Sequence, residues 1–130
     1  MTEFITFTLA GERYAIDSGF THEVFRLTMF SRLPSRNPLA FGVVVWRGDL
    51  LTILDIRSAL GLPLNALSDL ASVIVVGEAR PEFGILADRV HHVTALDAPL
   101  EPVSGRNLVA GMTPDAMQVL EPEALLRLQA

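Results

Sequence analysis

Residues 41–62, FGVVVWRGDLLTILDIRSALGL, decide how this chain folds. Two apolar runs, at 41–46 and 50–53, flank the tripeptide RGD at 47–49. Short apolar runs joined by a glycine-containing turn are typical of a β-hairpin, because glycine supplies the positive φ that a tight turn requires. We therefore expect two antiparallel strands that meet at Gly48.

A short helix is expected directly after this hairpin. Asp55 is suited to cap it, and Ile56 and Leu60 then fall on one face. Gly61 supplies a left-handed stop, and Pro63 prevents the helix from continuing. The hairpin and the helix together form one compact stretch with clear ends.

The sequence on either side of this stretch also predicts short strands. Residues 5–9 alternate apolar residues with threonine, and 13–17 return with Tyr14 and Ile16 on one face, as in a hairpin. Further strands are expected at 72–76, 83–87, 90–96, 108–112 and 117–120. Residues 21–29 fit either a short helix or a strand.

The whole pattern gives about nine or ten short strands and about two short helices at hairpin spacing. Such spacing is typical of β-barrels and sandwiches, and the number of strands exceeds what one small barrel needs. The chain has 130 residues, 50% of them hydrophobic, which suits one domain or two small lobes that share a core. We expect a mainly β protein with two partial barrels sharing an apolar seam.

Composition excludes several classes of function. The chain has no cysteine, which removes disulfides, thiolate nucleophiles and iron–sulfur sites. Its ten basic residues are scattered arginines in a chain of net charge −5, which argues against nucleic-acid binding. No apolar run approaches the roughly 18 residues of a membrane helix, and the N-terminus lacks the pattern of a signal peptide. We expect no membrane insertion and a cytoplasmic protein.

The sequence offers no pattern for catalysis, a cofactor or a metal. None of the common nucleotide-binding, hydrolase or metalloprotease motifs occurs, and the absence of lysine excludes a Walker lysine or a Schiff base. His91 and His92 are neighbours in a predicted strand, where they face opposite sides and cannot easily hold one metal. We therefore expect a protein that is not an enzyme.

Arg47 and Trp46 are the most informative polar and aromatic residues of the hairpin. Arg47 ends a very apolar strand. There it is simply solvated, or stacks its stem on a neighbour, or is an exposed anchor for a partner. Trp46 points opposite to Arg47 if the strand is regular, so that it belongs either to the core or to an interface. The residues alone leave these alternatives open.

Several segments, taken in order, resemble the CheW-like domain family. Residues 41–62 resemble its signature: glycine, an apolar run, Arg-Gly, a second apolar run, Asp-apolar-Arg and a leucine-glycine helix end. Residues 4–17 look like its first hairpin, and 83–90 look like its second-lobe motif. The end of the chain, at 111–112 and 119–126, is similar to its closing strand and leucine-rich helix.

This resemblance implies a single CheW-like domain over 1–130, made of two intertwined five-stranded β-barrels of the SH3-like type with short helices. One lobe is expected at roughly 15–75, the other at roughly 1–14 plus 76–120, with a closing helix at 121–128. The implied role is that of an adaptor without a cofactor. It couples the regulatory domain of a CheA-like histidine kinase to the tip of a methyl-accepting chemoreceptor in chemotaxis or motility signalling.

The resemblance also assigns roles to individual residues. Arg47 matches the arginine of the family's Arg-Gly pair, in the region that faces receptor and kinase. Asp55 and Arg57 match its Asp-x-Arg, which we assign with Gly48 and Gly61 to local structure. The expected partner-binding residues share or border one hairpin face: Val43, Val45, Trp46, Arg47 and Leu51. Two alternatives remain, a small β-barrel that binds a ligand and a divergent relative that no longer couples receptor to kinase.

Overall fold

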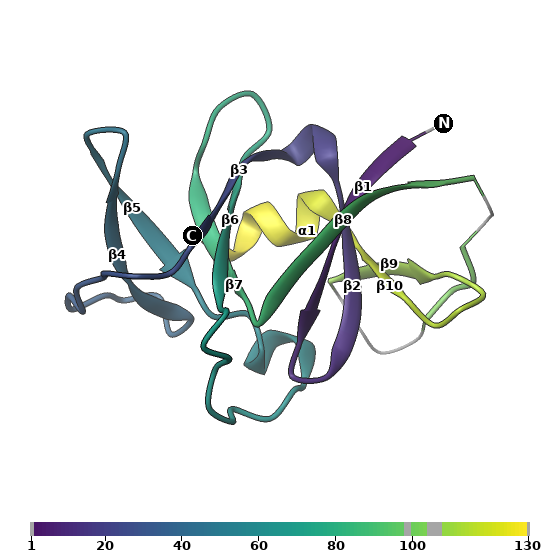
Figure 1. Ribbon diagram of the computed structural model, residues 1–130, viewed down its shortest axis with the longest axis horizontal. Coiled ribbons are helices and arrows are strands. Elements are labelled where there is room, and N and C mark those ends of the chain that lie inside the picture. The colour runs from purple at the N-terminus through teal and green to yellow at the C-terminus, as the bar shows by residue number, and fades with distance from the viewer. Residues whose placement is uncertain (1, 98–99, 104–107, 130) are drawn as a thin grey trace.

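Strands make up most of the fold. This computed structural model describes residues 2–97, 100–103 and 108–129. The strands are β1 (Thr2–Leu9), β2 (Glu12–Asp17), β3 (Thr21–Arg26), β4 (Ala40–Trp46), β5 (Asp49–Leu54), β6 (Ser72–Val76), β7 (Phe83–Ala87), β8 (Arg89–Leu96), β9 (Val109–Met112) and β10 (Gln118–Leu120). They form two five-stranded sheets, of order β8-β1-β2-β10-β9 and β3-β6-β7-β5-β4 (Figure 1). The predicted mainly β class with two five-stranded lobes is confirmed.

The two sheets are interleaved along the chain. The chain starts the first sheet with β1 and β2, builds the whole second sheet, and returns to the first with β8, β9 and β10. Each sheet contains one parallel pair, β2 with β10 and β5 with β7. The second sheet runs from Thr21 to Ala87, so its limits differ from the expected lobe at 15–75. In particular, β7 pairs with β5 and β6, and not with the strands of the terminal lobe.

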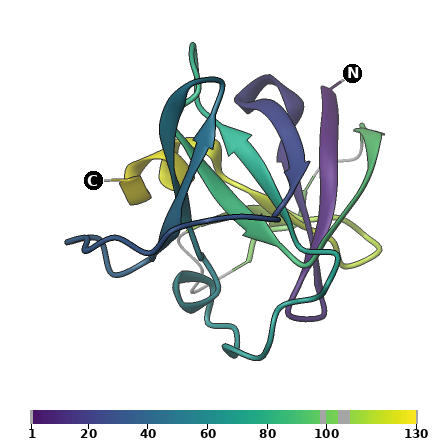
Figure 2. The same cartoon turned by 60° about the vertical axis from the view of Figure 1, so that its left-hand side comes forward.

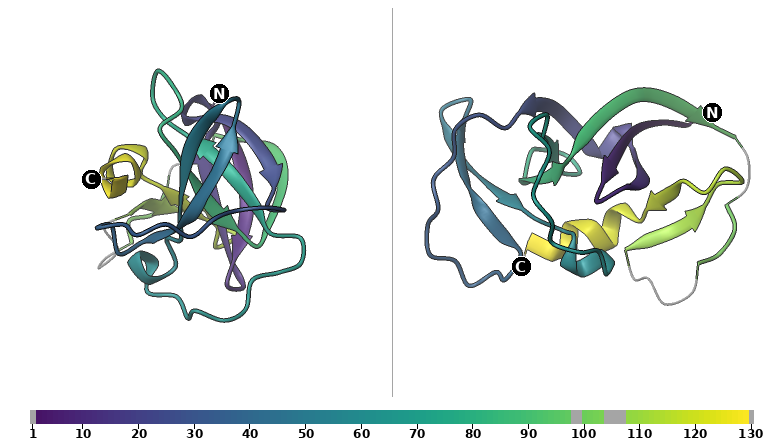
Figure 3. Two further views of the ribbon diagram at one scale, coloured as in Figure 1. Left: turned by 90° about the vertical axis from the view of Figure 1, so that its left-hand side faces the viewer. Right: turned by 60° about the horizontal axis from the view of Figure 1, so that its bottom comes forward.

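Neither sheet closes into a barrel by backbone pairing within the described residues. β3 and β4 form the two edges of the second sheet, and β8 and β9 those of the first. Single residues cover part of two edges, because Ser31 bridges Val43 on β4 and Glu101 bridges Met112 on β9. The expected barrels are therefore two curved, open sheets, as the turned views show (Figures 2 and 3).

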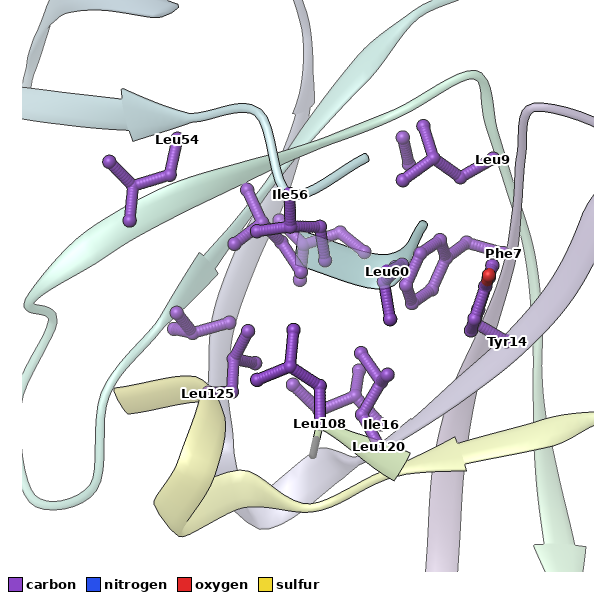
Figure 4. Packing of buried hydrophobic residues seen from close by; sticks show 14 of the residues in the cluster. Phe7, Leu9, Tyr14, Ile16, Leu54, Ile56, Leu60, Leu108, Leu120 and Leu125 are labelled. Carbon is purple, nitrogen blue, oxygen red and sulfur yellow. The ribbon is translucent and has the colours of Figure 1, made fainter. Parts of the chain in front are cut away.

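The main core lies where the two sheets meet. Side chains from both sheets and from the short helices pack there (Figure 4). The labelled members of this cluster are Phe7, Leu9, Tyr14, Ile16, Leu54, Ile56, Leu60, Leu108, Leu120 and Leu125. Both sheets therefore contribute to one apolar cluster, which is the arrangement expected of a single domain with two lobes.

Strand β6 shows why the most apolar runs of the sequence do not alternate apolar with polar residues. All five of its residues are buried. Ile74 and Val76 face the main core, whereas Val73 and Val75 face a second cluster within the second sheet. A strand with two buried faces needs apolar residues at every position. On neighbouring β7, Gly84 passes so close that an added Cβ would lie 2.4 Å from Val73 Cγ1.

Short helices complete the fold. They are η1 (Ser18–Phe20), η2 (Ser58–Leu60), α1 (Pro122–Leu126) and η3 (Arg127–Gln129), of which α1 is α-helical and the others are 3₁₀ turns. Gly61 follows η2 with φ 73° and ψ 24°, which confirms the expected left-handed stop. Residues 21–26, which allowed a helix or a strand, form strand β3. The helix expected at 121–128 is α1 continued by η3.

Candidate functional site

The turn between β4 and β5 sets the geometry of the site. Trp46 pairs with Asp49, so that Arg47 and Gly48 alone form the turn, with φ values of 51° and 84°. Positive φ at both central residues is the pattern of a type I′ hairpin. The turn is thus one residue shorter than the tripeptide RGD, and Asp49 is the first residue of β5.

Arg47 folds back over the hairpin because of its left-handed backbone. Its guanidinium carbon lies 4.7 Å from the centre of the Trp46 ring, within the range of a cation–π contact. Its NH2 group also donates to Glu23 Oε1 at 2.7 Å. The expectation that Trp46 and Arg47 point in opposite directions is wrong, because Arg47 belongs to the turn and not to a regular strand.

Glu23 on β3 holds both residues of the hairpin. Its second oxygen, Oε2, accepts a 2.7 Å hydrogen bond from the indole Nε1–H of Trp46. The hydrogen bonds from Trp46 and Arg47 lower the pKa of Glu23, because both favour the charged carboxylate. Arg47 nevertheless keeps 67% of its side chain exposed, so that its held guanidinium stays accessible to solvent.

The outer face of the hairpin is apolar and exposed. Val45 pairs with Leu50 across the two strands, and these side chains are 75% and 69% exposed. Val43 lies on the same face two residues earlier, where it pairs with Thr52 and is partly buried. We call Val43, Val45, Leu50 and Arg47 the hairpin face.

Leu51 does not belong to this face. It pairs with Val44, and both side chains point into the second core cluster. Leu51 is only 5% exposed, so the expectation that it contacts a partner is wrong. Leu50 takes its place, because a two-residue turn puts Leu50 opposite Val45.

A groove runs beside β4. Its volume is about 430 Å³, and the residues that line it come from β3, from β4 and β5, and from the segment between β3 and β4. The apolar members of its lining include Phe25, Met29, Phe30, Val43, Val45 and Leu50. Met29 is 83% exposed. Met29 and Phe30 are not among the partner-binding residues that the sequence predicts. They lie next to a proline-containing segment that predicts only a loop.

Asp55 and Arg57 form a structural ion pair. Arg57 NH2 donates to Asp55 Oδ2 at 2.7 Å, its Nε donates to Oδ1 at 3.0 Å, and its NH1 donates to the carbonyl oxygen of Asn65. The bond to Asp55 raises the pKa of Arg57. Asp55 also accepts the backbone N–H of Arg57, directly before η2. These contacts of Asp55 and Arg57 are local, and they lie directly before η2.

Within the described residues, no group of three or more histidine, cysteine, aspartate or glutamate side chains is placed to hold a metal ion. The histidines have separate neighbours: His91 lies beside Thr8, and His22 contacts the carbonyl oxygen of Gly77. The helices in this part of the chain are all too short or too polar to cross a membrane.

Two interleaved β sheets with an exposed, arginine-tipped hairpin define a small β-rich domain. The family model described as CheW-like domain matches residues 3–130, and the chain therefore belongs to the CheW-like domain family. This confirms the resemblance found in the sequence.

One curated protein is similar to this chain in sequence, and one solved structure is similar to it in fold. The chain is 26% identical over 91 residues to the chemotaxis protein CheW of Bacillus subtilis (strain 168). The match covers 70% of this chain and 58% of that protein's length. The crystal structure of the scaffolding protein TtCheW from Thermoanaerobacter tengcongensis has a TM-score of 0.78 at 24% identity, over 92% of this chain and 88% of that chain. The structural match supports the fold.

Proposed function

We propose that this protein is a cytoplasmic adaptor that couples the regulatory domain of a CheA-like histidine kinase to the tip of a methyl-accepting chemoreceptor. In this role it catalyses no reaction and needs no cofactor. It acts by holding two partners at fixed positions. Membership of the CheW-like family and the hairpin face support this proposal.

The hairpin face is the observation that carries the proposal. It combines exposed apolar area at Val45 and Leu50 with an accessible arginine. Arginine next to apolar side chains is favoured at binding hot spots, because it adds directional hydrogen bonds to buried area. A face of this kind on an otherwise well-packed domain is suited to contact another protein.

The contacts of Arg47 also reduce the cost of binding. A free arginine side chain loses about 0.5–1.5 kcal/mol of conformational freedom when a partner immobilises it. Here Glu23 and the ring of Trp46 already restrict Arg47 in the free protein. A partner therefore meets a guanidinium whose position is largely set.

An adaptor between kinase and receptor does not need a tight interface. In an assembly with many copies, each additional contact is intramolecular, so modest contacts sum to a stable array. The hairpin face is small, which fits one such modest contact. We expect affinity for a single isolated partner to be in the range of weak, reversible complexes.

Crosslinked capture from the source organism tests the proposal. The purified protein is used as bait in a lysate, and captured proteins are identified by mass spectrometry. Wild type is compared with Arg47→Glu and Val45→Asp, and Leu64→Asp is the matched control, because Leu64 is an exposed leucine outside the hairpin. Circular dichroism confirms that each variant is folded.

We expect wild type and Leu64→Asp to capture a CheA-like kinase or a methyl-accepting receptor, and the two hairpin variants to lose it. Capture of neither protein by the wild type contradicts the adaptor role. Equal capture by all four proteins contradicts the assignment of the hairpin face.

A further inference from the structure

We propose that the groove beside β4 receives an extended, acidic and apolar peptide segment, which adds to the edge of β4 by backbone pairing at Val45. This inference rests on the proposed function, since it specifies the chemistry of one partner segment. It depends on three separate observations: a free strand edge, an apolar lining and a local excess of positive charge.

The first observation is the free edge. Val43 donates its backbone N–H to Ser31 and accepts the N–H of Ser31, at 2.8 and 2.9 Å, on the side of β4 away from β5. Val45 lies two residues further on, so its N–H and C=O point to the same side. Neither group has a hydrogen-bond partner among the residues that the structure describes. Ser31 thus occupies one position of the edge and leaves the next one open.

The second observation is the lining of the groove. Val45 and Leu50 on the hairpin, and Met29 and Phe30 on the opposite wall, present apolar side chains to it. Side chains of an extended peptide alternate between two sides. One set would enter the groove and the other would face its rim. Strand addition of this kind takes affinity from backbone bonds and specificity from the side-chain pockets.

The third observation is charge. The chain as a whole carries −5, yet residues 24–46 contain three arginines, Arg26, Arg32 and Arg36, and no aspartate or glutamate. Arg26 lines the groove. It donates to the carbonyl oxygen of Asp69, while Arg32 lies over the rings of Phe30 and Phe41, so neither charge is neutralised by a carboxylate of the described chain. A groove with a positive rim favours an acidic segment.

Two other occupants fit these observations less well. A second copy of this chain would offer one of its sheet edges, β3, β4, β8 or β9. Of these strands only β3 carries an acidic residue, Glu23, and its carboxylate already binds Trp46 and Arg47. An anionic lipid surface would match the arginines, but it offers no backbone groups to Val45. The combination of edge, lining and charge favours an acidic peptide.

Selection from a library of random heptapeptides displayed on phage tests the inference. The purified protein is the target, and selected peptides are synthesised with a fluorescent label for anisotropy titrations. Each is also made with N-methyl groups on alternate amides, which removes strand pairing while keeping side chains and charge. Unilamellar vesicles of anionic phospholipid are the comparison probe.

Three variants locate the binding. Val45→Pro removes the outward N–H, and an edge strand tolerates proline where the N–H faces solvent. Val45→Thr is its matched control, because threonine keeps the N–H and the β-branched shape. Arg26→Glu reverses the charge at the rim. We expect Val45→Pro and Arg26→Glu each to weaken binding about tenfold, and Val45→Thr to remain within about threefold of wild type.

We expect the selected peptides to alternate aspartate or glutamate with apolar residues, and N-methylation to abolish binding. The inference is overturned if no acidic consensus emerges, if N-methylated peptides bind as well as their parents, or if only vesicles bind. N-methylation changes the peptide and not the protein. The comparison of methylated with unmethylated peptides therefore tests the inference even if Val45→Pro fails to fold.

These outcomes separate the inference from the proposed function. If acidic peptides bind at Val45 but neither kinase nor receptor is captured, the groove inference stands and the adaptor role fails. If a kinase or receptor is captured but no acidic peptide is selected, the adaptor role stands and the groove inference fails.

Discussion

The indole of Trp46 on β4 donates a 2.7 Å hydrogen bond to the carboxylate of Glu23 on β3. These two strands are the opposite edges of the second sheet and do not pair through their backbones. The side chains thus join two edges that the backbone leaves apart. Arg47 binds the other oxygen of the same carboxylate, so one acidic residue fixes the tip of the hairpin.

This link should respond to acid. The pKa of Glu23 is lowered below its ordinary value of 4.5, first by Trp46 and then by Arg47. A carboxyl group with a lowered pKa stabilises the folded state above its ordinary pKa, and this contribution is lost as the pH falls through the folded-state value. Trp46 is the only tryptophan, so its fluorescence reports the loss directly. We expect an emission change with a midpoint below pH 4.5.

Glu23→Gln is the control for this titration, because glutamine keeps an acceptor for the indole but does not ionise. Its emission should stay constant over the same pH range while far-ultraviolet circular dichroism remains native. A midpoint at or above pH 4.5, or the same transition in Glu23→Gln, would show that Glu23 does not control the environment of Trp46.

Truncation of Leu51 and of Val45 should have very different effects on stability. Leu51→Ala opens a cavity in the second cluster, and such changes cost about 2–5 kcal/mol of unfolding free energy. Val45→Ala removes an exposed side chain and should change stability by no more than about 0.5 kcal/mol. Urea unfolding followed by circular dichroism measures both. Similar losses in the two variants would contradict the assigned register of the hairpin.

Removing Asp55 should destabilise the protein strongly. Its partner Arg57 has only 8% of its side chain exposed, so Asp55→Ala leaves a charge in a poorly hydrated place. Breaking a buried pair by removing one partner costs about 3–5 kcal/mol, and we expect about 3 because Asp55 is the more exposed of the two. In a double-mutant cycle with Arg57→Met, the double variant should lose much less than the sum of the single losses. Additive losses would argue against the pair.

Gly42→Ala should loosen the bridge between Ser31 and β4. A Cβ at this position would lie 2.8 Å from the carbonyl oxygen of Ser31 and 2.9 Å from Cδ2 of Phe30. The crowding should cost about 1–3 kcal/mol and speed hydrogen exchange at the amide of Val43, which donates to Ser31.

Gly48→Ala is the comparison for this variant. An added Cβ there meets nothing within 4 Å, but φ is 84°, so the strain should lower stability by about 1–2 kcal/mol without changing exchange at Val43. Equal exchange at Val43 in Gly42→Ala and the wild type would mean that the bridge adapts to the added methyl group.

The local features of the fold could be predicted from the sequence because they depend on near neighbours. A glycine turn between apolar runs indicates the β4–β5 hairpin, and Gly61 indicates the end of η2. The resemblance to CheW-like domains added the number of strands in each lobe. The limits of the lobes are harder to predict from the sequence. The position of β7 depends on parallel pairing with β5, which lies about 30 residues away in the chain.

The candidate site shows the same distinction. The sequence points to Arg47 and Val45, which the structure places on the hairpin face. It points to Leu51 where the structure exposes Leu50, because an unbroken apolar run does not reveal which residues face the core. A turn of only Arg47 and Gly48 places Leu50 opposite Val45, which is the register that the structure has. The sequence does not predict that Glu23 accepts hydrogen bonds from Trp46 and Arg47. It lies in a segment that fitted a helix or a strand, and its contacts span more than 20 residues.

The interleaved order of the strands has a consequence for synthesis on the ribosome. The second sheet is continuous in the chain and can pair as soon as β7 has emerged. The hairpin of β1 and β2 can pair early, but its sheet is completed only by β8, β9 and β10. During that delay, the core cluster that contains Phe7 and Tyr14 lacks its C-terminal members Leu108, Leu120 and Leu125. We expect a polypeptide released before β10 is made to leave part of this core exposed, so that the cell's chaperones and proteases can distinguish it from the complete domain.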